Sequence, residues 1–188
     1  MVGNSRNLYN FAPMDSKRYS LQRIASIHVE PYLAIYAKKK FAKDPATGAI
    51  KIPDTFDLYH CVWQVMRRRP MDTKPLGDEN LQIWLPARRC AEGVTQKNPA
   101  YWNYISPRGA RHVENQLRRL FNWEFHHYCE ENLAMGVSKV DTVRNFIRQY
   151  GFSLDSEDAL LKNLQRYQIA MSTFLNIKMR KNKKRRKI

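Results

Sequence analysis

Residues 107–135 carry apolar side chains at helical spacing, and a helix of this length offers a long apolar face for other elements to pack against. Ser106 followed by Pro107 is typical of an N-cap and a first helical position, and Gly136 is typical of the residue just after a helix. The apolar positions share one face, at Val113, Leu117, Leu120, Phe121, Phe125, Tyr128 and Cys129. The pattern predicts one long amphipathic helix that has to bury this face.

Two more helices are expected after it. Ser138 with Asp141 three residues on is similar to a capping box, and Gly151 is expected to close that helix. Its inward residues are predicted to be Val140, Val143, Ile147 and Tyr150. Asp155 or Ser156 is expected to open the last helix, which should end near residue 176.

The last helix has apolar residues spaced four and three apart. We call Leu160, Leu164, Tyr167, Met171 and Phe174 the heptad seam, because this spacing is that of a heptad repeat. The seam is only about two heptads long. We favour packing within the chain, and we keep a homodimer contact as the alternative.

The first half of the chain has shorter patterns. Pro31 fits the first turn of a helix that runs to Phe41, and the residues just before it, 27–29, fit a short strand. Another helix is expected from Asp54 or Thr55 to Arg69. The residues that alternate as short strands, and should pair with each other, are 50–52 and 81–85.

These patterns predict a mainly α fold with a small β element of two or three short strands and a C-terminal helix-turn-helix-like pair. The expected organisation has four segments. They are a loosely ordered arm at 1–22, a helical core with the β element at 23–135, the helix-turn-helix-like unit at 136–176, and a disordered basic tail at 177–188.

The charge of the chain points to a polyanionic partner. Lysine and arginine number 33 against 17 acidic residues, which gives a net charge of +16 and a pI near 10.0. Eight basic residues lie within 178–187, so about half of the excess belongs to the rest of the chain. So large a charge raises the self-repulsion of the compact state, and a phosphate backbone is its commonest partner. We expect nucleic acid rather than anionic lipid, and no membrane partner.

Residues 136–188 combine a capped helix, a short turn led by glycine, a second amphipathic helix and a basic tail. This arrangement resembles helix-turn-helix proteins of phages and other mobile elements, which would imply a transcriptional regulator or an accessory DNA-binding factor. On the second helix, the outward residues suited to base edges or phosphates are Lys162, Asn163, Gln165 and Arg166. The acids at the start of this helix, Asp155, Glu157 and Asp158, would repel phosphates there.

The first helix and the tail supply the remaining candidate contacts to the DNA backbone. On the first helix they are Lys139, Arg144 and Arg148. In the tail they are Arg180, Lys181, Lys183, Lys184, Arg185, Arg186 and Lys187. The main hypothesis is therefore a DNA-binding protein that is not an enzyme.

Two alternatives stay open. An RNA-binding role in a ribonucleoprotein would use the aromatic cluster Tyr101, Trp102 and Tyr104, near Lys97, Arg108 and Arg111, to stack bases. A structural subunit of a phage or mobile-element assembly would use only the tail on nucleic acid. The arginine clusters at 67–69, 88–89 and 118–119 would add a phosphate groove if they converge on one face.

Several other classes find little support. The three cysteines, Cys61, Cys90 and Cys129, are far apart and form no CxxC pair, which argues against disulfides and a cysteine zinc site. His126 and Glu130 share a helix face, but HExxH is missing, so we expect no metal and no cofactor. We identify no catalytic motif. An apolar N-terminal stretch and a run of membrane-spanning length are both missing, so we expect a cytoplasmic, nucleoid-associated protein.

Overall fold

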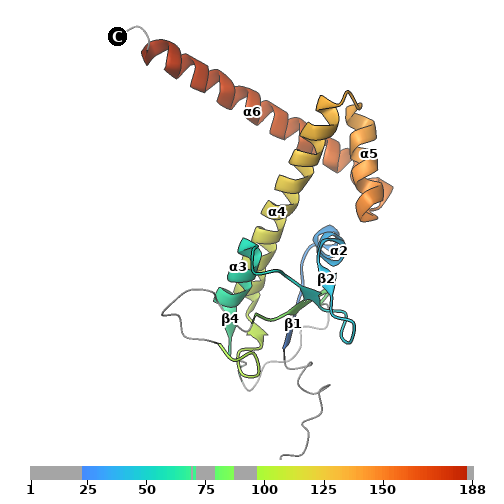
Figure 1. Cartoon of the computed structure of the whole chain (residues 1–188), viewed down its shortest axis with the longest axis vertical. Helices are drawn as coiled ribbons and strands as arrows, with labels where there is room; N and C mark the ends of the chain where they lie inside the picture. The colour runs from blue at the N-terminus through green and yellow to red at the C-terminus, as the bar shows by residue number, and fades with distance from the viewer. Residues whose placement is uncertain (1–22, 69, 71–78, 87–96, 186–188) are drawn as a thin grey trace, which may run out of the picture. The chain divides into compact units, whose positions relative to one another are not determined.

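A computed structural model describes residues 23–68, 70, 79–86 and 97–185, with only the backbone of 176 and 179–185. The predicted arm at 1–22 lies outside the described residues. The chain forms two compact units. Unit 1 contains the strands and the helix α3, and unit 2 contains α2, α5, α6 and all of α4 beyond residue 114 (Figure 1). The described residues are mainly helical with a small β element, which confirms the predicted fold class.

Unit 1 is built on a sheet in the order β1-β5-β3-β2. Its strands are Ile24–Ile27, Leu81–Trp84, Ile50–Lys51 and Ala42–Lys43, taken in that order. β1 and β5 are antiparallel, whereas β3 and β5 are parallel, with Ile50 opposite Ile83. The predicted pairing of 50–52 with 81–85 is therefore confirmed. β1 lies earlier than the segment 27–29 that the sequence suggested.

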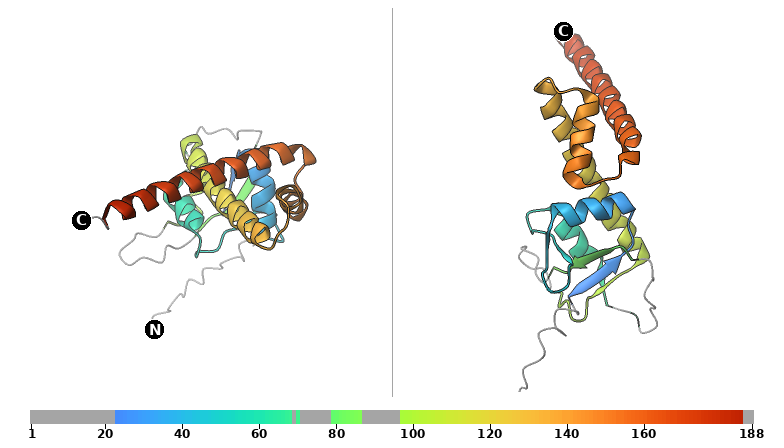
Figure 2. Two further views of the ribbon diagram at one scale, coloured as in Figure 1. Left: turned by 90° about the horizontal axis from the view of Figure 1, so that it is seen from above. Right: turned by 90° about the vertical axis from the view of Figure 1, so that its right-hand side faces the viewer.

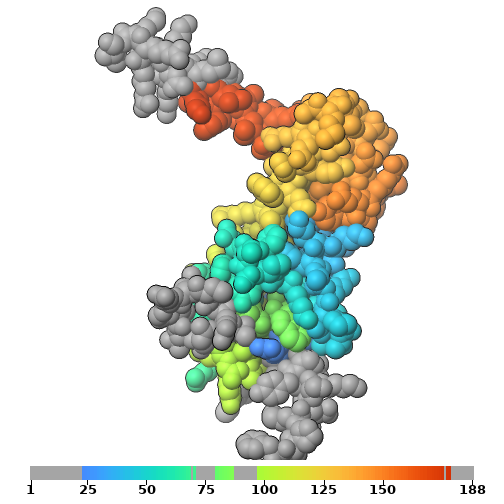
Figure 3. All heavy atoms as spheres, viewed as in Figure 1, coloured from blue at the N-terminus to red at the C-terminus, as the bar shows by residue number. Residues whose placement is uncertain are grey.

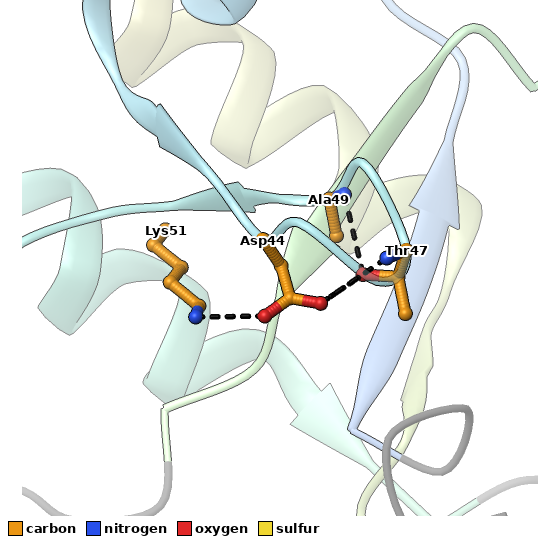
Figure 4. A network of polar contacts seen from close by, with 4 residues as sticks. All are labelled: Asp44, Thr47, Ala49 and Lys51. Atoms are coloured by element: carbon orange, nitrogen blue, oxygen red, sulfur yellow. Dashed lines mark hydrogen bonds and ion pairs between the residues drawn. The ribbon is translucent and has the colours of Figure 1, made fainter. Parts of the chain in front are cut away.

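The turn between β2 and β3 is held by the carboxylate of Asp44, whose side chain is largely buried (Figure 4). Its Oδ1 lies 2.7 Å from the ammonium of Lys51, and its Oδ2 accepts hydrogen bonds from the hydroxyl and the backbone N–H of Thr47. These partners, Lys51 first, lower the pKa of Asp44 below its ordinary value. Gly48 completes the turn with a φ of 71°, in the left-handed region that favours glycine.

The helix α3, Asp57–Val65, is shorter at both ends than the predicted 54–69. Phe56 occupies the N-cap position, after a turn in which the carbonyl of Pro53 accepts from the N–H of Phe56. At the other end Met66 is extended and fully buried, and Met66–Arg67 form β4 against β6, Tyr104–Ile105. Pairing with a distant strand overrides the helical pattern here. Arg67 is therefore in a strand and not in the last turn of a helix.

Unit 2 contains α2, Pro31–Lys40, up to its residue 39, and the three predicted C-terminal helices, the first of which begins in unit 1. α4 spans Pro107–Ala134 and α5 spans Lys139–Tyr150. Gly136 and Gly151 follow these helices with φ of 84° and 73°, as expected for left-handed caps. Ser138 caps α5 by accepting from the N–H of Asp141. A short 3-10 turn, Leu154–Ser156, leads into α6, Glu157–Arg185.

The core of unit 2 is aromatic. Phe146 of α5 lies within 4.7 to 6.2 Å, between ring centroids, of rings from α4, from α5 itself and from the segment after α5. Those rings belong to Phe121, Phe125, Tyr128, Tyr150 and Phe152. The predicted inward face of α5 is corrected at one position, because Val140 is 37% exposed while Phe146 is 1% exposed.

A carboxylate at the edge of this core joins three helices. Glu124 of α4 accepts hydrogen bonds from the hydroxyls of Tyr36 on α2 and Tyr150 on α5. Burial first, and then the hydrogen bond to Glu124, raise the pKa of both phenols above their ordinary value. Both tyrosines are therefore kept neutral in the folded protein at a pH where they would ionise in the unfolded chain.

This arrangement predicts loss of stability in alkali. The unfolded chain releases the phenol protons near pH 10 and the folded chain does not. The free energy of unfolding should therefore be level at neutral pH and fall as pH rises above about 10. Denaturant unfolding between pH 8 and pH 11 measures the fall, which should be shallower in Tyr36→Phe and Tyr150→Phe. Equal slopes in the wild type and both variants would contradict the assignment.

α6 is longer than the sequence predicted. Its backbone continues to Arg185, whereas the helix was expected to end near residue 176 and to be followed by a disordered tail. Both views in Figure 2 show the C-terminal half of α6 extending beyond α4 and α5. The space-filling view also shows α6, in red, leaving the body of unit 2 (Figure 3). We call residues 178–187 the basic segment, and part of it thus continues a helix that is anchored in unit 2.

Candidate nucleic-acid interface

The helix, glycine-led turn and second helix expected at 136–176 are all present in unit 2, as α5, the turn at 151–156 and α6. Two side-chain contacts join the helices. Arg144 Nε lies 3.0 Å from the carboxylate of Glu157, and Lys139 Nζ donates to the side chain of Gln168 over 2.8 Å. The ion pair neutralises the charge of Glu157, one of the acidic residues at the start of α6 that were expected to repel phosphates.

Most of the predicted contact residues in this unit are exposed. On α6 Lys162, Gln165 and Arg166 are exposed, and on α5 Lys139, Arg144 and Arg148 are exposed. Leu160 and Leu164 are buried on the other side of α6, so helical spacing places Lys162 and Arg166 on its outer side. We call Lys162, Gln165 and Arg166 the α6 basic face.

Asn163 does not belong to that face. Its Oδ1 is 2.8 Å from Nε2 of His126, and its Nδ2 donates to Oδ1 of Asn122 over 3.1 Å. Both partners are on α4, so the amide that was expected to meet a base edge joins α6 to α4. A signal was present in the sequence, because Asn163 precedes Tyr167 by four residues and therefore shares the side of the heptad seam.

The heptad seam divides into a buried and an exposed half. Leu160 and Leu164 are 7% and 2% exposed, and the ring of Tyr167 stacks on His126 with centroids 3.9 Å apart. Tyr167 also donates to Glu130 of α4 over 2.6 Å. Met171 and Phe174 are 39% and 60% exposed, because α6 has passed the body of unit 2 there. Packing within the chain thus holds for the first half, and the homodimer contact stays a prediction.

The structure places the predicted tail residues only in part. The backbone of residues 180, 181 and 183–185 is helical and belongs to α6, and their side chains are not described. Arg186 and Lys187 lie outside the described residues. The α6 basic face and the first part of the basic segment therefore share one helix.

Unit 1 brings together a second group of cations. The ammonium of Lys97 donates to the backbone carbonyls of Trp63, Gln64 and Met66 over 2.7 to 3.2 Å, which satisfies acceptors at the end of α3. Desolvation, and then repulsion by the nearby Arg67, lower the pKa of Lys97. Two arginines of the predicted clusters, Arg67 and Arg68, thus lie near Lys97. The arginines at positions 69, 88 and 89 fall outside the described residues.

The aromatic cluster of unit 1 lies beside these cations. Lys97 Nζ is 5.1 Å from the ring centroid of Trp102, and the guanidinium carbon of Arg68 is 5.6 Å from the same centroid. Tyr101, the preceding residue in the chain, is 69% exposed. Trp102 and Tyr104 are half-buried. Of the three rings considered for base stacking, Tyr101 is therefore the one that is open to a ligand.

The polar residues of α4 that resembled metal ligands have other partners. His126 bonds Asn163, and Glu130 accepts from Tyr167. Burial raises the pKa of the Cys129 thiol to about 12 and that of Cys61 to about 11, so neither is a thiolate at neutral pH. Among the described residues no three histidine, cysteine or acidic side chains are grouped as a metal site requires.

No protein-family model matches the chain, and neither the curated proteins nor the solved structures contain a match. In the part of the chain that the structure describes, no helix has both the length and the apolar character that crossing a membrane requires.

Proposed function

We propose that the protein binds nucleic acid without catalysing a reaction on it, with double-stranded DNA as its first candidate partner. The observation that carries the proposal is the course of α6. This helix is anchored in unit 2 by its buried side, exposes Lys162 and Arg166 on its outer side, and continues into the basic segment. Cations along one exposed helix suit a linear array of phosphates.

The contacts favour backbone binding over base reading. Asn163 is bonded to α4, Arg144 is paired with Glu157 and Lys139 donates to Gln168, so three of the residues expected to meet DNA already have partners. Lys162 lies in the second turn of α6 and Arg166 lies one turn later, so both are beyond the acidic residues at the start of the helix. We therefore infer that this helix contributes phosphate contacts from its second turn onward, with Gln165 as the remaining polar candidate for a base edge.

The proposed role is that of an accessory factor or transcriptional regulator of a mobile element, located with the nucleoid. The charge and the α6 basic face support the nucleic-acid binding in this role, and the mobile-element part rests on the resemblance of residues 136–188 to helix-turn-helix proteins. A structural subunit of a phage or mobile-element assembly is the second candidate, and in it only the basic segment would touch nucleic acid. RNA binding in a ribonucleoprotein is the third, and the exposed ring of Tyr101 favours it.

Charge removal from the α6 basic face tests the proposal. We expect the double variant Lys162→Ala, Arg166→Ala to lower duplex affinity roughly tenfold and to reduce the salt slope by about 2, because each phosphate contact contributes about 1. The measurement is fluorescence anisotropy of a labelled duplex over a range of salt.

The double variant Lys38→Ala, Lys39→Ala is the matched control. It removes the same charge from exposed positions of α2 and should leave the slope nearly unchanged. Equal effects of the two double variants would mean that only net charge matters. Failure of the wild type to bind duplex DNA at low salt would refute the first candidate, and preferential competition by single-stranded RNA would favour the third.

A further inference from the structure

Unit 1 contains a hollow that the proposed DNA contacts of unit 2 do not use. Its volume is about 500 Å³, and Arg68, Ala100, Tyr101 and Asn103 line it. This volume falls within the usual range of small-ligand pockets. The lining combines an exposed aromatic ring, a guanidinium and a carboxamide. These three groups are the ones that stack on a base, meet a phosphate and bond a base edge.

Tyr101 lies on a tight turn whose backbone is hydrogen-bonded. The carbonyl of Asn98 accepts from the N–H groups of Tyr101 and Trp102 over 3.0 and 2.9 Å. The side chain of Asn98 accepts from the N–H of Ala100, and Asn103 Nδ2 donates to the carbonyl of Ala100. Four side-chain and backbone bonds thus fix a short loop whose aromatic side chain remains 69% exposed. Because the backbone that carries the ring is already ordered, the loop loses little conformational entropy when a ligand stacks on the ring.

The hollow also has a cation in its lining. Arg68 directly follows β4 and lies against Trp102. Among the described residues Lys97 is also at Trp102, and three carbonyls hold it in place. Arg67 lies close enough to Lys97 to lower its pKa. Of these cations Arg68 lines the hollow itself, where its charge attracts an anionic ligand, and its flat guanidinium can also lie over the face of a base.

We propose that this hollow binds one unpaired nucleobase, with its phosphate, from a single strand of nucleic acid. Tyr101 stacks on the base, and Arg68 contacts the phosphate or the second face of the base. The side-chain oxygen of Asn103, whose nitrogen donates to Ala100, accepts from a donor on the base edge. The base has to be unpaired, because a base inside a duplex offers neither face to a protein ring. This inference rests on the proposed function, since it assumes that the chain meets nucleic acid.

The test compares two single-stranded probes of equal length and charge, an oligothymidine and the same backbone with abasic positions. For the full chain we expect the oligothymidine to bind roughly tenfold more tightly, in line with the usual effect of base stacking on an aromatic side chain. Tyr101→Ala should remove this preference, and Tyr101→Phe should retain it. Because Tyr101 is mostly exposed, neither change should affect folding.

The Lys162→Ala, Arg166→Ala variant is the control for phosphate contacts elsewhere. It should weaken both probes and leave their ratio unchanged. A ratio near one in the wild type, or a ratio that survives Tyr101→Ala, would overturn the inference while binding itself persists. If the wild type binds neither probe nor a duplex at low salt, the proposed function fails as well.

Discussion

Replacing Phe146 by alanine should lower the free energy of unfolding by about 3–5 kcal/mol, which is the usual cost of deleting a buried phenyl ring. Phe146 is 1% exposed and lies between rings of α4 and the segment that follows α5. Alanine would leave a cavity among bulky side chains, where collapse is limited because each of the neighbouring rings is held by its own segment of the chain. Since a domain of ordinary stability has only about 5–15 kcal/mol, this one change removes a large share of it.

Phe174→Ala is the matched control for this prediction. It deletes the same ring from a position on α6 that is 60% exposed, and it should change the free energy of unfolding by less than about 0.5 kcal/mol. Denaturant unfolding followed by the helical circular dichroism signal measures both. A loss below about 1 kcal/mol for Phe146→Ala would mean that the aromatic cluster does not form the core of unit 2.

The helices of unit 2 could be predicted because their signals are local. A capping serine, a terminal glycine and one apolar face define α4 and α5 within a single stretch of sequence, and the structure has these boundaries nearly where they were expected. The pairing of β3 with β5 was also found, because both strands alternate. The predicted end of α3 was wrong because Met66 pairs with Ile105 and Arg67 with Tyr104 in a small sheet. No local pattern reveals a strand partner so far along the chain.

The sequence predicted that the candidate site includes a basic helix face, but it did not predict every residue of the site. Exposure of Lys162 and Arg166 follows from helical spacing, because both oppose buried leucines. Asn163 was misplaced because its amide looked like a base reader, whereas its partners, His126 and Asn122, lie about forty residues away. The hollow beside Tyr101 needed the fold, since its lining comes from the end of β4 and from a turn more than thirty residues later.

Raising the salt concentration from 50 to 200 mM should weaken duplex binding by the full chain roughly a thousandfold or more. That is the loss expected when six or more phosphates are neutralised, with a slope near −0.9 for each contact. The basic segment alone supplies eight cations at 178–187, and Lys162 and Arg166 add to them. A chain ending after Asn176 should bind much more weakly at 50 mM salt and show a shallower slope. Anisotropy titrations at several salt concentrations give both quantities.

The residual affinity of the shortened chain separates the candidate functions. Because the shortened chain keeps the α6 basic face, the proposal requires measurable duplex binding at low salt with a slope of about −2. A full-length variant with glutamine at all eight basic positions of 178–187 is the matched control, since it removes the charge and keeps the chain length. If both forms lose all affinity, the folded body makes no phosphate contacts and the structural-subunit role is favoured. If both keep the full slope, the basic segment is only solvated, and the phosphate contacts come from the folded units.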